Sequence, residues 1–307
     1  MGSEITAKEI EIPVENGYLA AKEWGLSTGE PVLALHGWQD NAATFDRLIP
    51  LLSPDLHIVA IDYIGHGRSS HKTDGLPYFK LEFIYHIKLI AEYFNWKKFS
   101  IIGHSWGSEF AITFSSMYPE MIDKVIGIDL LKPVTYSVEG ISSKIKRKID
   151  EYKAEQEKIK NNSNPPVYTK EEATKRLLNS EYNDCGEDEI KLLIERGTKE
   201  IEPGKYVFTR DPRIKYVWDC GFNSSVVMKS LISNIRCGLL LIKAKRSPIF
   251  SDQESYNEFL KLYSEKCSRF EYVEIDGNHF IHLSYPERIA PIINAFIKGD
   301  ELENYKK

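Results

Sequence analysis

The stretch Phe99-Ser-Ile-Ile-Gly-His-Ser-Trp-Gly107 decides the fold of this chain. Its first four residues form a short apolar run of the kind that makes a buried strand. The pentapeptide Gly-His-Ser-Trp-Gly follows at once, and Phe110 and Phe114 then recur on one side of a helical stretch. A strand, a Gly-x-Ser-x-Gly turn and a helix in this order predict that the hydroxyl of Ser105 projects above a sheet, with the helix N-terminus pointing at it.

Short apolar runs on either side of this stretch predict the rest of the sheet. Runs that are apolar on both faces suit parallel strands covered by helices, and stretches with helical spacing lie between them, as at Phe83, Ile87 and Ile90. The chain begins with two alternating segments around Asn16-Gly17, which predict an antiparallel hairpin. We therefore expect an α/β fold with a doubly wound, mostly parallel sheet. The further runs are 31–35, 57–61, 125–128, 238–242 and 270–275.

About a hundred residues separate the predicted sixth strand from the next one, near Gly238. This interval contains a stripe of isoleucines from Ile141 to Ile149 on a charged helix, and Thr169 with Glu172 has the form of a capping box. A third helix is expected near 190–195. We predict that residues 134–234 form a helical lid, inserted between two parts of one core, 1–133 and 235–307. A structural insertion with no role in binding is the alternative.

Two loops are placed to serve Ser105. His36-Gly37-Trp38 follows a strand, and its glycine lets the backbone approach a substrate oxygen, so the backbone N–H groups of Trp38 and Trp106 are the predicted oxyanion donors. His279, in the loop after the last strand, is the predicted base. His282 is its rival and is expected to be structural, as is His104. The loop from Asp62 to Ser69 is expected to shape the scaffold.

The acid that would orient His279 is harder to place. It is usually found after the seventh strand, where this chain has Ser247. Asp129 ends the sixth strand, and in this kind of sheet that position also lies beside the histidine loop. Asp252 is the fallback acid, although it also suits the N-cap of a helix. We expect Asp129 to be the acid.

Composition excludes several other classes of function. A formal net charge of -5 gives no reason to expect nucleic acid or an anionic membrane as partner. The four cysteines form no Cys-x-x-Cys pair, so neither a metal site nor a disulfide framework is expected, and the chemistry needs no cofactor. The N-terminus is not a signal peptide, and no stretch is apolar enough to span a bilayer. A cytoplasmic protein, monomeric or homodimeric, is expected.

The motifs resemble those of the serine hydrolase-like proteins of animals, the group that includes the insect kraken proteins. The resemblance covers nearly the whole chain. It is carried by the loops and the Gly-x-Ser-x-Gly turn, the nucleophile elbow, described above. More specific still are Gly197-Thr198, Phe208-Thr-Arg-Asp-Pro-Arg213 and Leu241-Ile-Lys-Ala244. It implies the α/β-hydrolase fold with a lid. Haloalkane dehalogenases and coelenterazine luciferases are more distantly similar. They have an aspartate as nucleophile, and some have the acid after the sixth strand, a precedent that favours Asp129.

These observations predict hydrolysis of a small, fairly apolar carboxylic ester. Ser105 in place of an aspartate argues against dehalogenase or epoxide-hydrolase chemistry. Aromatic residues near the site suggest an apolar pocket, although they serve equally well as the core of the lid: Trp38, Trp106, Tyr136, Phe208 and Trp218. Two alternatives remain open. One is a hydrolase-fold receptor that binds a small molecule, and the other is a cofactor-free oxygenase, isomerase or lyase that reuses the same three residues.

Overall fold

The computed structural model describes residues 6–15, 17–135, 139–161, 165–180, 184–219, 224–250 and 252–305. Within them, eight strands form one sheet in the order β1-β2-β4-β3-β5-β6-β9-β10. The β1–β2 hairpin and its pairing with β4 are antiparallel, and the remaining pairs are parallel. The strands are β1 (Lys8–Val14), β2 (Gly17–Trp24), β3 (Glu30–Leu35), β4 (Leu56–Ile61), β5 (Phe99–His104), β6 (Ile122–Ile128), β9 (Gly238–Ala244) and β10 (Arg269–Ile275).

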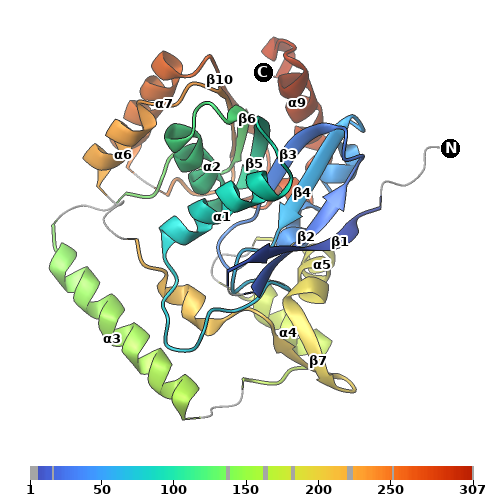
Figure 1. Ribbon diagram of the computed structural model, residues 1–307, viewed down its shortest axis with the longest axis vertical. Coiled ribbons are helices and arrows are strands. Elements are labelled where there is room, and N and C mark those ends of the chain that lie inside the picture. The colour runs from blue at the N-terminus through green and yellow to red at the C-terminus, as the bar shows by residue number, and fades with distance from the viewer. Residues whose placement is uncertain are drawn as a thin grey trace.

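Helices cover both faces of this sheet (Figure 1). Because successive side chains of a strand point to opposite faces, Leu239 and Leu241 of β9 join one core while Leu240 and Ile242 join the other. The first core is closed by α1 (Lys80–Tyr93), α2 (Trp106–Met117), α6 (Ser225–Ile232) and α7 (Gln253–Lys266), and the second by α9 (Pro286–Lys298). The predicted doubly wound sheet is confirmed.

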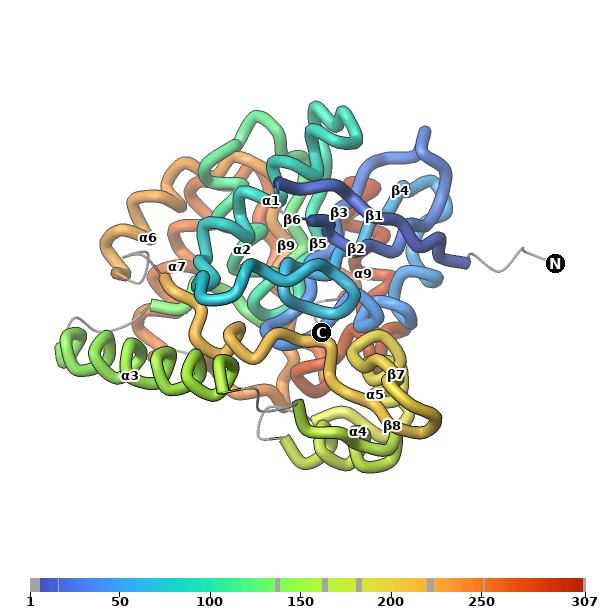
Figure 2. The backbone as a smooth tube through the Cα atoms, turned by 60° about the horizontal axis from the view of Figure 1, so that its bottom comes forward, coloured from blue at the N-terminus to red at the C-terminus, as the bar shows by residue number. Residues whose placement is uncertain are grey.

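The segment between β6 and β9 contains the three predicted helices, α3 (Ile141–Lys160), α4 (Lys170–Leu178) and α5 (Glu187–Gly197). Thr169 and Glu172 form the predicted capping box at the start of α4. The sequence reading missed a hairpin, β7 (Thr198–Glu202) and β8 (Lys205–Phe208), which turns at Gly204 with a φ of 74°. Figure 2 shows this hairpin grouped with α4 and α5, while α3 lies apart. No helix among the described residues is long and apolar enough to cross a membrane.

A buried ion pair ties α5 to the sheet. Arg196, with only 3% of its surface exposed, lies with its Nε 3.0 and 2.9 Å from the two carboxylate oxygens of Asp62. The same carboxylate accepts the backbone N–H groups of Ala42 and Arg68. Asp62 therefore shapes its own loop, as the sequence predicted. It also anchors the inserted segment, which the sequence did not indicate.

We expect Arg196→Met to lower the free energy of unfolding by about 3–5 kcal/mol, because it leaves the Asp62 carboxylate buried without its cation. Urea denaturation followed by circular dichroism measures the change. Arg147→Met is the matched control, since Arg147 pairs with Glu151 on the exposed surface of α3 and is expected to contribute less than about 1 kcal/mol. Equal midpoints for the two variants would contradict the anchoring role.

Candidate active site

Ser105 occupies the sharp turn between β5 and α2. Its φ of 50° and ψ of -117° lie outside the regions that most residues adopt. The turn is this tight because two glycines flank it: a Cβ on Gly107 would lie 2.0 Å from the carbonyl oxygen of Leu35, and one on Gly103 would lie 2.5 Å from the backbone of Gly107. The N–H of Ser105 donates to the carbonyl of Ile128 at 2.8 Å, which fixes the elbow to β6. The predicted strand–turn–helix setting is present.

His279 lies between Ser105 and Asp129. It is in the loop that joins β10 to the short helix α8 (Ile281–Ser284). Its Nε2 is 3.1 Å from the Oγ of Ser105, and its Nδ1 is 2.6 Å from Oδ2 of Asp129. The structure thus brings together the three residues that the sequence singled out, and it leaves Nε2 of the imidazole facing the serine.

Asp129 is held from the sheet side. It follows β6 directly, has a φ of 52°, and is 1% exposed. Its N–H donates to the carbonyl of Ile242 in β9, and its Oδ1 accepts the N–H of Ala244 at 2.9 Å. The parallel register of β6 and β9, with Ile128 opposite Ile242, therefore carries the carboxylate across to the end of the neighbouring strand.

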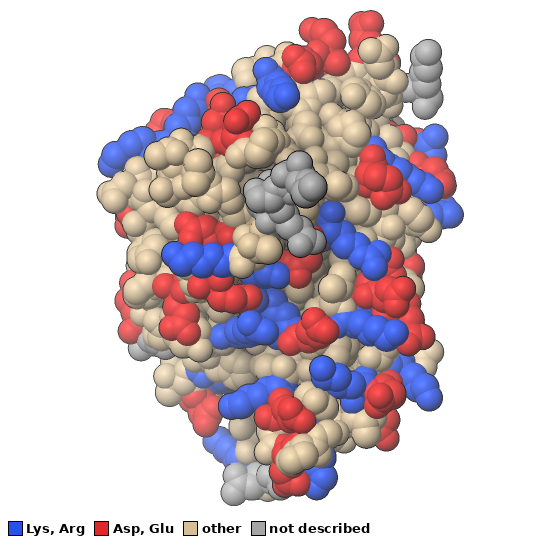
Figure 3. All heavy atoms as spheres, turned by 90° about the vertical axis from the view of Figure 1, so that its right-hand side faces the viewer, with Lys and Arg blue, Asp and Glu red and all other residues tan. Residues whose placement is uncertain are grey.

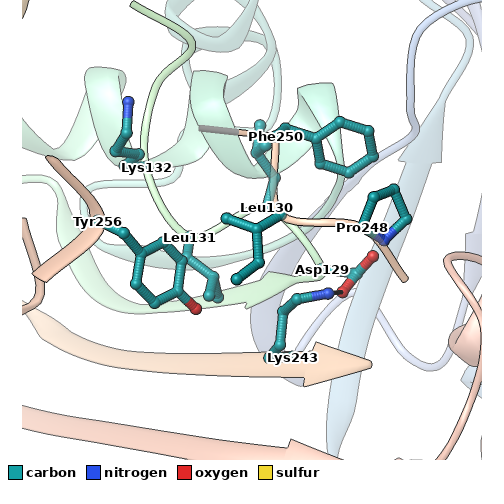
Figure 4. Close-up of a pocket in the computed structure, with 9 residues that line it drawn as sticks. Asp129, Leu130, Leu131, Lys132, Lys243, Pro248, Phe250 and Tyr256 are labelled. Carbon is teal, nitrogen blue, oxygen red and sulfur yellow. Dashed lines mark hydrogen bonds and ion pairs between the residues drawn. The ribbon is translucent and has the colours of Figure 1, made fainter. Parts of the chain in front are cut away.

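Lys243 is the partner of Asp129 that sequence reasoning missed. Its Nζ is 2.9 Å from Oδ1 of Asp129 and also donates to the backbone carbonyls of Ala244 and Ser247. Figure 4 shows this ammonium group against the carboxylate, in a small pocket that Pro248 also lines. The signal available in the sequence was a lysine near the end of an otherwise apolar strand, because a buried ammonium group needs an anion.

The other two positions considered for the acid do different work. Ser247 has its Oγ 3.5 Å from Nδ1 of His279, at the limit of a hydrogen bond. The carboxylate of Asp252 accepts the N–H of Ser255 at 2.7 Å and caps α7. The described structure therefore places Asp129, and not Asp252, against the imidazole.

The predicted oxyanion donors flank the elbow. Trp106 is the first residue of α2, where a backbone N–H has no acceptor within the helix. The loop that carries Trp38 passes close by, since a Cβ on Gly37 would lie 3.4 Å from the Cβ of Ser105. The indole of Trp38 donates to the carbonyl of Ile214 at 3.1 Å, and this bond ties the loop to the inserted segment.

Buried side chains also contact the loop of His279, the predicted base. His104 donates from Nε2 to the carbonyl of His279 at 3.0 Å, and its ring lies 4.0 Å from that of His282. His282 bonds the hydroxyl of Thr44 at 2.7 Å. Among the described residues, the hydrogen bonds of both rings go to groups other than the Ser105 hydroxyl, and a structural role stays a prediction for them. With Asp40 they bring one possible metal ligand each to within 4.8 Å of one another.

Burial keeps five of the described histidines neutral. It lowers the pKa of His36 and of His86 to about 4 and that of His282 to about 3. It also holds the pKa values of His66 and His104 well below the ordinary value. Protonation at any of these positions would place a positive charge in a buried environment, which costs free energy.

The folded protein is therefore expected to lose stability as pH falls below about 6.5, where the same histidines take up protons in the unfolded chain. Asp40, whose pKa burial raises to about 7, opposes this trend. Thermal unfolding between pH 7 and pH 5 measures the effect. His86→Gln is expected to reduce the loss by about 2 kcal/mol, because it removes one such proton. A melting temperature that does not change over this range would contradict the prediction.

A cavity of about 860 Å³ lies beside this site, between the sheet and the inserted segment. Trp38 and Phe280, which neighbour the oxyanion loop and the base, line one part of it, and Phe208 of β8 lines another. Trp218 contacts Tyr152 of α3 and does not line the cavity, and Tyr136 lies outside the described residues. The wall is less apolar than the sequence suggested, because it also contains Lys175, Arg176, Arg210 and Lys215.

Comparison with known proteins shows the family to which the chain belongs. Residues 30–286 match the family model for the alpha/beta hydrolase fold. The chain is 36% identical to human serine hydrolase-like protein 2 over 94% of each chain, and 34% identical to a probable serine hydrolase of Drosophila melanogaster over 95% of this chain and 88% of the fly protein. A solved hypothetical protein from Pseudomonas aeruginosa PAO1 superposes with a TM-score of 0.80 at 27% identity, over 95% of this chain and 99% of that one. The chain belongs to the α/β-hydrolase fold family and, within it, to the serine hydrolase-like proteins.

Proposed function

We propose that this protein hydrolyses a small carboxylic ester with an apolar acyl group, through an acyl-enzyme on Ser105. The observation that carries the proposal is the continuous hydrogen-bonded line from the Oγ of Ser105 through His279 to Asp129. A serine hydroxyl is a weak nucleophile unless a base removes its proton, and an oriented imidazole is the group that does so at neutral pH.

In the first half-reaction the Oγ of Ser105 attacks the ester carbonyl while Nε2 of His279 takes its proton. Asp129 accepts the Nδ1–H, which fixes the tautomer and stabilises the imidazolium. The backbone N–H groups of Trp38 and Trp106 bind the oxyanion. The imidazolium then protonates the leaving alcohol, and the acyl group stays on Ser105. Water, deprotonated by His279, releases the acid and restores the serine.

Residues 134–234 contain the lid in this proposal, over a core of 1–133 and 235–307, and α6 at the end of that range packs against the core. Support comes from the cavity, whose wall combines core residues such as Trp38 with residues of α4, α5 and β8. A lid in this place excludes water from the acyl-enzyme and sets which esters enter. The rings of Trp38 and Phe280 suit the apolar acyl group.

A fluorophosphonate probe is expected to label the purified protein at one position, Ser105, and short p-nitrophenyl esters are expected to be hydrolysed. Mass spectrometry of the labelled peptide identifies the residue, and heat-denatured protein is the control. Absence of both labelling and turnover would refute the proposal. Tight binding of an ester without its turnover would favour the receptor function instead.

A further inference from the structure

Four basic residues line the cavity between lid and core without a carboxylate partner. Among the described residues, no carboxylate oxygen lies within ion-pair distance of Lys175, Arg176, Arg210 or Lys215. The buried guanidinium groups of Arg196 and Arg213, by contrast, each pair with a buried aspartate. On the face in Figure 3, Lys and Arg side chains lie among those of Asp and Glu. The cavity wall thus carries four basic side chains and two acidic ones, those of Asp40 and Glu172.

Arg210 is the centre of this group. Its Nη1 donates to the carbonyl of Gln39 at 2.9 Å, next to the oxyanion loop. Burial, and then the nearby guanidinium of Arg176, lower the pKa of Arg210 to about 10. The ring of Tyr168 lies 5.6 Å from the guanidinium carbon of Arg176. Two guanidinium groups that face one cavity repel each other, so an anion bound between them would be stabilised by both.

The cavity also contains two acidic residues, and the Asp40 carboxyl group partly offsets the effect of Arg176 on Arg210. Glu172 spends one carboxylate oxygen on the N–H of Thr169, 2.8 Å away, in the capping box. Asp40 accepts the N–H of Asn41, and burial raises its pKa to about 7. The hydroxyl of Thr209 is buried and has no hydrogen-bond partner among the described residues, so it is available as a further donor.

The cavity adjoins residues that flank the reacting groups, and Ser105 and His279 themselves do not line it. Trp38, whose N–H is a proposed oxyanion donor, and Phe280, which follows the base, line its wall together with Arg210. A volume of about 860 Å³ is that of a site for a drug-sized molecule. A substrate with its carbonyl at Ser105 would extend its other part toward the arginines.

We propose that Arg210 and Arg176, with the hydroxyl of Thr209, bind an anionic group in the alcohol or thiol part of the substrate, and that Lys175 and Lys215 attract it to the opening. The substrate class is then an ester or thioester of an apolar acid, whose alcohol or thiol part carries a phosphate or a carboxylate. This inference rests on the proposed hydrolase function and specifies its substrate.

Three butyrate esters that share the same acyl group test this proposal. The ester of 4-hydroxybenzamide is neutral, that of 4-hydroxybenzoate carries a carboxylate, and that of 4-hydroxyphenyl phosphate carries a phosphate monoester. We expect kcat/KM for one of the anionic esters to exceed that for the neutral ester at least tenfold, and the better anion identifies the group. Arg176→Gln and Arg210→Gln are expected to lower this ratio to near one, mainly through KM, and Arg210→Lys to retain part of it. Exposed Arg147→Gln is the control.

Loss of Arg210 also leaves the Gln39 carbonyl without its donor, which can slow the hydrolysis of every ester. The ratio of kcat/KM for the anionic ester to that for the neutral ester cancels this general effect, so it reports on the anion site alone. Turnover of the neutral ester with no preference for either anion would overturn the anion site and leave the hydrolase function standing. If no ester is cleaved and no fluorophosphonate labels Ser105, the proposed function fails. The site is then decided by titrating 4-hydroxyphenyl phosphate and 4-hydroxybenzoate by calorimetry: binding lost in both arginine variants supports it, and no binding overturns it.

Discussion

Ser105→Ala is expected to lower the kcat for p-nitrophenyl ester hydrolysis by about four to six orders of magnitude and to abolish fluorophosphonate labelling. The methyl group cannot form the acyl-enzyme, so only the oxyanion donors and substrate binding would remain to favour the attack of water. The variant should fold normally, because within the described ranges the Oγ of Ser105 bonds His279 and no backbone group. Steady-state kinetics and intact-protein mass spectrometry give both readouts.

Ser116→Ala is the matched control for this substitution. Ser116 lies on α2, the helix that begins at the Ser105 turn, and among the described residues its hydroxyl bonds only the carbonyl of Ile112 within that helix. Its loss is expected to leave turnover and labelling in place. If the Ser105→Ala protein keeps its turnover and its labelling, the nucleophile is another residue and the proposed mechanism is wrong.

Asp129→Asn is expected to lower kcat by about four orders of magnitude. The asparagine amide can turn its N–H₂ toward Nδ1 of His279, and the proton then sits on Nε2, where it blocks transfer from Ser105. The same change removes the negative charge beside Lys243. A loss of stability is therefore expected together with the loss of rate, and urea denaturation measures it separately from kcat.

Two further variants separate these effects. Asp252→Asn keeps a side-chain oxygen for the N–H of Ser255 and is expected to leave kcat unchanged. Asp129→Asn combined with Lys243→Met removes the unpaired ammonium group, so it should recover stability without recovering rate. An Asp129→Asn enzyme with unimpaired kcat, or a comparable loss in Asp252→Asn, would rule out Asp129 as the acid.

The sequence predicted the sheet because its strands are short, apolar runs whose burial does not depend on distant partners. It did not predict the β7–β8 hairpin, where the residues of β7 are exposed and lack an apolar run to mark a strand. It also missed the Arg196–Asp62 pair, whose members are 134 residues apart in the chain. Contacts of this kind depend on how the inserted segment packs, and local pattern carries no record of that packing.

The site divides in the same way. The elbow at Ser105 and the loop of His279 are local motifs, and the structure brings them within 3.1 Å of each other. The choice between Asp129 and Asp252 depended on the register of β6 against β9, which no short motif encodes. The charge of the cavity was hidden for a related reason, since Arg176 and Arg210 come from separate elements and meet only in the folded chain.

The Asp129–Lys243 ion pair constrains how this active site can evolve. Either residue replaced alone leaves its partner's charge buried, so each single-step path leads through a weakened intermediate. A carboxylate that arose at Ser247, 3.5 Å from the imidazole, would place a second anion beside Asp129, and the two would compete for one histidine. In a lineage that carries this lysine, we therefore expect the proposed acid to stay at the end of β6, because a shift to the position after β9 requires at least two coordinated substitutions.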